Sequence, residues 1–158
     1  MLSLAVLTGF AGEKNGRIEK ERLITIVNDC SHMDGADVVK MGSFGTAAVK
    51  SLIRSAADGK DTKQILDLIK GIKRVAIVDY EDCSSSQKRT ISRRIENALS
   101  DSELLMEMKD GEDIMRMYGV LEEGSSTIRD FVLYTPGNCA LICLFGKISM
   151  DAIIETIR

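Results

Sequence analysis

The stretch "NCALICLFGK" (Asn138–Lys147) decides the fold, because it predicts a β-strand with apolar side chains on both faces. Pro136-Gly137 and Gly146 bound the run, which leaves it too short for a helix. Alternate residues of a strand share a face. One face would carry Cys139, Leu141, Cys143 and Phe145, and the other Ala140, Ile142 and Leu144. A strand that is apolar on both faces belongs in the middle of a covered sheet.

Two cysteines in this run, Cys139 and Cys143, raise the question of a metal or redox pair. Four residues of a strand span about 13 Å, whereas a disulfide needs Cα atoms within about 7 Å. We therefore interpret both as small core residues. Cys30 and Cys83 complete the set, and the spacing matches no common zinc motif. The sequence leaves disulfide pairing among the four open; we favour free, mostly buried thiols.

Three further strands are predicted just before this one. Apolar residues alternate over 104–109, Asp110-Gly111 is a strong hairpin signal, and a second strand runs to Leu121. "IRDFVLYT" (128–135) is the third. Together the four strands predict a C-terminal four-stranded meander, followed by a helix that Ser149 caps.

The first half of the chain is predicted to be richer in helix. Apolar residues spaced i, i+3, i+4, i+7 predict a helix over 19–31, and Ser84 with Gln87 has the form of a capping box. Further helices are expected from Thr46 and from about residue 61, with strands at 38–41 and 74–80. The fold class is therefore α+β: a largely antiparallel sheet with helices packed mainly on one face. The order of elements also allows one or two parallel pairs, which would make the sheet mixed.

The N-terminal run "MLSLAVLTGFA" (Met1–Ala11) ends in the small-x-small form of a signal-peptidase site. We interpret 1–11 as the remnant of a secretory signal peptide, 12–18 as a flexible lead and 19–158 as a single α+β domain. Export to the periplasm or cell envelope follows from this interpretation. If Met1 is the true start, the run is instead a genuine N-terminal element and the protein is cytoplasmic. No segment reaches the ~20 apolar residues of a membrane-spanning helix.

Three segments, "LLMEMKDGEDIMRMYG", "IRDFVLY" and "LICLFGKISMDAIIETI", carry a family resemblance. From about residue 19 onward the chain resembles the uncharacterised exported bacterial family known as domain of unknown function 4252. The resemblance implies signal-bearing proteins of Bacteroides-type bacteria, many of them lipoproteins. This chain has no cysteine at the junction after Ala11 that could carry a lipid. The family supplies no functional residues.

Few residues suggest chemistry. His32 is the only histidine, and a possible metal cluster lies around it, with His32 and Asp34 as the candidate ligands and Asp29, Cys30 and Asp37 nearby in the sequence. A surface histidine at a helix end is the commoner role. Gly42–Thr46 could cradle a phosphate but lacks the Gly-Lys-Ser/Thr of a P-loop. Methionines alternate at 106/108 and 115/117; adaptable core packing is their commoner role, and a soft copper site is the alternative.

We therefore expect no catalytic, cofactor-binding or metal-binding residues and no cofactor. The net charge of −3 gives no attraction to nucleic acid. The interpretation is an exported, non-catalytic globular domain that acts on a protein or cell-envelope partner, and more an interaction module than an enzyme. The alternative is a small-ligand or metal-binding protein, or an enzyme, with a pocket near Gly42–Thr46 or His32. The partner and the oligomeric state are left open.

Overall fold

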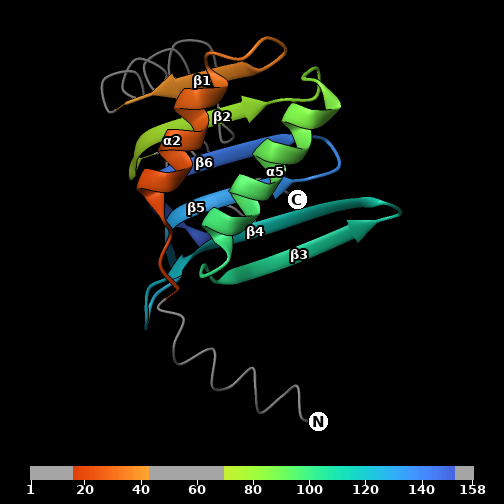
Figure 1. Ribbon diagram of the computed structural model, residues 1–158. Coiled ribbons are helices and arrows are strands. Elements are labelled where there is room, and N and C mark those ends of the chain that lie inside the picture. The colour runs from red at the N-terminus through yellow and green to blue at the C-terminus, as the bar shows by residue number, and fades with distance from the viewer. Residues whose placement is uncertain (1–15, 43–69, 152–158) are drawn as a thin grey trace, which may run out of the picture.

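The computed structural model describes residues 16–42 and 70–151, which form two helices and six strands (Figure 1). The helices are α2 (Lys20–Cys30) and α5 (Ser85–Leu99). The strands are β1 (Asp37–Met41), β2 (Ile72–Asp79), β3 (Leu104–Asp110), β4 (Asp113–Leu121), β5 (Thr127–Thr135) and β6 (Ala140–Ser149). The predicted α+β class is confirmed. The predicted signal remnant 1–11 and the helices expected from Thr46 and residue 61 lie outside the described residues.

All six described strands belong to one sheet, in the order β1-β2-β6-β5-β4-β3. Strands β3 to β6 follow one another both along the chain and across the sheet, and β1 and β2 extend it beyond β6. Every neighbouring pair is antiparallel. The parallel pairs that the sequence allowed do not occur among these strands, because β1 and β2 pair antiparallel and β3 joins the opposite edge from β2.

Strand β6 lies between β2 and β5, as predicted for the opening stretch. Leu141 and Cys143 are fully buried on one face, and Leu144 packs into a second apolar cluster on the other. Cys139 was wrongly placed in the strand: it precedes β6, with φ +52°, in a turn closed by its N–H donating to the Pro136 carbonyl. Its carbonyl accepts from the Tyr80 N–H at 2.9 Å, which ties this turn to the end of β2.

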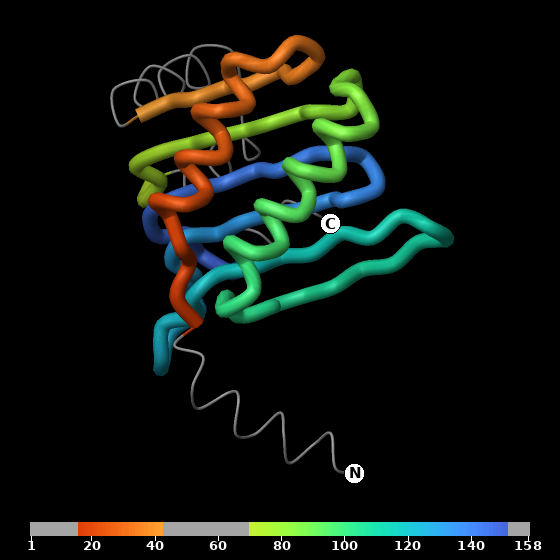
Figure 2. Tube along the Cα trace, viewed as in Figure 1, coloured from red at the N-terminus to blue at the C-terminus, as the bar shows by residue number. Residues whose placement is uncertain are grey.

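Both helices cross the same face of the sheet (Figure 2). In α2 the predicted apolar stripe is buried, and in α5 the predicted capping box forms: Ser84 Oγ accepts from the Gln87 N–H while the Gln87 side chain accepts from the Ser84 N–H. The buried side chains are Leu23, Ile26, Val27 and Cys30 in α2 and Ile91, Ile95, Ala98 and Leu99 in α5. These two stripes and one face of the sheet form the larger core.

The opposite face of the sheet carries a second apolar cluster, which includes Ile72, Ile128, Phe131 and Ile148. Because both faces of β5 and β6 are apolar, the central strands read as nearly continuous hydrophobic runs in the sequence. Among the described helices, none has the length and the apolar character needed to cross a membrane.

Candidate functional site

Two β-bulges lie side by side, one on each flank of Gly146. In β5 the register shifts between Arg129 and Phe131, and in β2 it shifts between Ile72 and Arg74. Both shifts occur opposite the Phe145–Gly146 peptide of β6. A bulge adds a residue to one strand, increases the local twist and redirects side chains, and bulges are frequent beside functional sites. The pairing of β6 with β2 and with β5 is therefore distorted at the same position along β6.

Asp130 is the single β5 residue opposite Phe145 and Gly146, so the extra residue of this bulge lies in β6, and Asp130 adopts φ +59°. This left-handed conformation is uncommon outside glycine, although aspartate tolerates it better than most residues. The carboxylate is nearly buried: Oδ1 accepts from the Gly146 N–H at 3.1 Å, and Oδ2 lies 3.6 Å from Lys20 Nζ. These two contacts tie β5 to β6 and to the start of α2.

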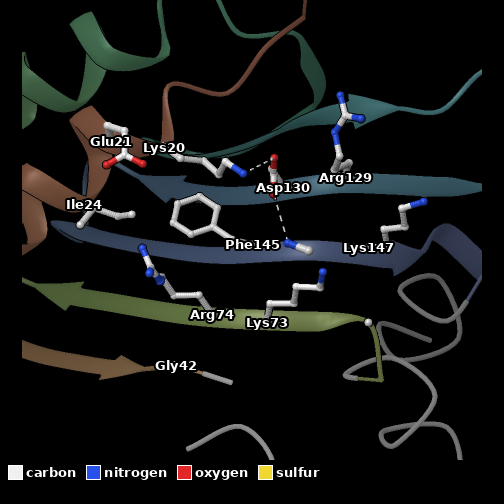
Figure 3. Close-up of a pocket in the computed structure, with 12 residues that line it drawn as sticks. Lys20, Glu21, Ile24, Gly42, Lys73, Arg74, Arg129, Asp130, Phe145 and Lys147 are labelled. Carbon is white, nitrogen blue, oxygen red and sulfur yellow. Dashed lines mark hydrogen bonds and ion pairs between the residues drawn. The ribbon is translucent and has the colours of Figure 1, made fainter. Parts of the chain in front are cut away.

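A cavity of about 610 Å³ opens over these bulges (Figure 3). We call it the bulge cavity. Its volume is in the range of ligand pockets. Phe145 and Ile24 supply apolar wall, and Asp130 and Glu21 supply negative charge. The described cationic residues that line it are Lys20, Lys73, Arg74, Arg129 and Lys147.

Cations outnumber anions around the bulge cavity by five to two among its described lining residues. Lys20 pairs with Asp130, and Lys147 Nζ lies 3.3 Å from Glu122 Oε1. No ion pair or hydrogen bond joins the guanidinium of Arg74 or Arg129 to another described residue. Each guanidinium presents a planar set of N–H donors that suits a carboxylate or a phosphate. The arrangement is suited to holding an anion.

The cysteines are poor nucleophiles in this environment. Burial raises the pKa of Cys143 from 9.0 to about 12 and that of Cys30 to about 11. Burial also raises the pKa of Cys83 and of Cys139. The thiolate is the reactive form of cysteine, so these four side chains are protonated and unreactive near neutral pH.

The two metal candidates from the sequence lie away from the bulge cavity. His32 and Asp34 are both exposed in the turn that follows α2. No group of three or more histidine, cysteine, aspartate or glutamate side chains suitable for a metal occurs within residues 16–42 and 70–151. Gly42 does line the bulge cavity, whereas residues 43–46 of the proposed phosphate loop lie outside the described residues.

The sequence reasoning missed Asp130, Gly146 and the two arginines. One signal was present: "IRDFVLYT" has a charged residue inside an otherwise apolar strand, and an isolated glycine interrupts β6. A glycine inside a strand pattern is a known indication of a bulge or of close backbone approach. Taken together, these two irregularities mark the position of the cavity.

The fold defines a small α+β domain built on one antiparallel sheet. Residues 38–156, more than half of the chain, match the family described as Domain of unknown function (DUF4252), and the chain belongs to that family. The resemblance stated from the sequence is thereby confirmed. No curated protein and no solved structure matches the chain.

Proposed function

We propose that the chain is a non-catalytic binding domain, exported to the cell envelope, that recognises an anionic group on its partner through the bulge cavity. The observation that carries this proposal is the pair of guanidiniums, of Arg74 and Arg129, on opposite sides of the cavity without an anionic partner among the described residues. A carboxylate or a phosphate bound between them would meet charged donors from β2 and β5 together.

The wall chemistry supports binding in a defined orientation. Phe145, which is only 4% exposed, presents its ring to the cavity between Lys20 and Arg74 (Figure 3). An apolar surface next to charged donors suits a ligand that carries an anionic group on a hydrocarbon part. The Asp130 carboxylate does not prevent this, since Gly146 and Lys20 already satisfy it.

The absence of a reactive constellation among the described residues supports a non-catalytic role. Catalysis by a nucleophile needs a base within hydrogen-bonding reach and a group that orients the base. His32 is exposed in a turn, and no hydrogen bond joins its imidazole to another described residue. The thiols are protonated, for the reasons given above. Asp130 is held by two structural contacts.

The charge-reversal variant Arg74→Glu/Arg129→Glu tests the site. The full chain is titrated with inorganic phosphate and, separately, with a hexaglutamate peptide, while amide shifts are followed by NMR. We expect saturable shifts at Arg74, Arg129 and Gly146 with at least one probe. In the variant we expect binding to weaken by at least about tenfold, since each lost charge-assisted contact contributes about 1.5–3 kcal/mol.

The matched control is Arg89→Glu/Arg93→Glu. It changes the net charge equally, on the exposed side of α5 and away from the bulge cavity. It should bind as the wild type does. Equal loss in both variants would mean that only net charge matters, and no saturable shift with either probe would contradict anion recognition. A response to phosphate alone would identify a small-anion site, and a response to the peptide alone would identify carboxylate recognition on a protein.

Export is the second part of the proposal, supported by the pattern in Met1–Ala11. We expect the protein isolated from its native cells to begin at or near Gly12, as measured by N-terminal sequencing, and to fractionate with the envelope. An intact Met1 on protein from the cytoplasmic fraction would contradict export and leave the cavity proposal untouched.

A further inference from the structure

Four methionines occupy one face of the hairpin formed by β3 and β4. Met106 pairs directly with Met117, and Met108 pairs directly with Met115. Directly paired residues of antiparallel strands share a face, and so do residues two apart along a strand. The four side chains therefore stand at the corners of one rectangle, which we call the methionine cluster.

The dimensions of the methionine cluster suit a single ion. Paired Cβ atoms lie about 5 Å apart across the strands, and Cβ atoms two residues apart lie about 7 Å apart along each strand. An ion above the centre would be about 4–5 Å from every Cβ. The methionine sulfur lies two bonds beyond Cβ on a flexible chain. All four sulfurs can thus reach a common point without any change of backbone.

Solvent reaches the cluster from the β3 side. Met108 is 50% exposed and Met106 is 42% exposed, while Met117 is only 9% exposed and packs into the second apolar cluster. Strand β3 is at the edge of the described sheet, and the hairpin extends beyond α5 (Figure 1). Packing in a core accounts for Met117 but does not account for two half-exposed methionines paired with two more sheltered ones.

We propose that the methionine cluster is a binding site for a soft monovalent cation, copper(I). Thioethers are uncharged, soft ligands that select copper(I), whereas magnesium and calcium require oxygen ligands. The next pair along the same face is Asp110 with Asp113, both exposed. Their negative charges attract a cation to this end of the hairpin, at a distance within the screening length of physiological salt.

Silver(I), which shares the preference of copper(I) for sulfur and does not change oxidation state, is the first probe. The full chain, labelled with ¹³C at the methionine ε-methyl groups, is titrated with silver(I). At one equivalent we expect the methyl signals of Met106, Met108, Met115 and Met117 to shift together, while those of Met33 and Met41 stay in place. Copper(I), added without oxygen against a bicinchoninate competitor, should then bind with the same stoichiometry.

The variant Met108→Leu/Met115→Leu removes one cross-strand pair of ligands and nearly conserves volume, so the sheet should persist. Loss of an outer-shell partner alone costs metal sites about 10- to 100-fold in affinity, and we expect at least that loss here. The matched control, Met33→Leu/Met41→Leu, should retain wild-type affinity. Silver(I) uptake without movement of the four methyl signals would assign binding to the cysteines and overturn the proposal. No uptake at all would overturn it equally. The wild-type methyl spectrum decides the matter even if a variant does not fold.

Discussion

Replacing Phe145 with alanine is expected to lower the free energy of unfolding by about 3–5 kcal/mol, the usual cost of deleting a core aromatic side chain. Phe145 is 4% exposed and lies in β6, the strand between β2 and β5. Its ring belongs to the larger core beneath the helices and also forms part of the wall of the bulge cavity. Truncation would therefore leave a void that neighbouring side chains can fill only in part.

The measurement is urea denaturation followed by circular dichroism, with the slope against urea checked for two-state behaviour. Leu121→Ala is the matched control, because Leu121 is 47% exposed at the end of β4 and its truncation should cost much less. A loss below about 1 kcal/mol for Phe145→Ala would show that this ring is not part of a packed core.

The second large effect is expected for Gly146→Ala, which should cost about 3 kcal/mol or more. Gly146 has φ +130°, a conformation that side chains disfavour, and strain of this kind costs about 1–3 kcal/mol. An added Cβ would also lie 3.0 Å from Ile72 Cα and closer still to the Gly71 carbonyl oxygen. Ile72 begins β2 and Gly71 directly precedes it, so the start of β2 would have to move, and overpacking adds about 1–3 kcal/mol.

Gly124→Ala is the matched control for this variant. Gly124 also has a positive φ, +73°, but an added Cβ there meets nothing within 4 Å. We expect it to lose only about 1 kcal/mol, the conformational component. The difference between the two variants in urea denaturation then measures the backbone clash together with the greater strain of the Gly146 conformation. Equal losses would mean that β2 is not held against Gly146.

The parts of the fold that the sequence could predict depend on local signals. The apolar stripe of α2, the capping box at Ser84 and the hairpin after β3 each involve residues only a few positions apart. For the hairpin, the structure moves the turn by one residue: Asp110 pairs with Asp113, and the turn consists of Gly111 and Glu112. The order of the strands was harder to predict, because the hydrophobic pattern of β1 is the same whether the strand pairs parallel or antiparallel with its neighbour.

The bulge cavity could not be predicted because its residues are distant in sequence. Lys20, Arg74 and Arg129 come from α2, β2 and β5, and only the register of those strands with β6 brings them together. In the sequence each one is an ordinary surface charge. By contrast, the methionine spacing at 106/108 and 115/117 was visible, although the cross-strand pairing that joins the four was not.

At the paired bulges, the alternation of side chains between the two faces of the sheet is interrupted in β2 and in β5. Along β5 the side chains on the second apolar cluster change from the even position Ile128 to the odd positions Phe131 and Leu133, and β2 changes likewise between Ile72 and Val75. In β6, which lies between them, the alternation of side chains between the two faces is unbroken. In a regular strand, residues three apart lie on opposite faces, so Ile72 would be separated from Val75, and Ile128 from Phe131. The two irregularities therefore allow both ends of β2 and of β5 to place apolar side chains in the same cluster.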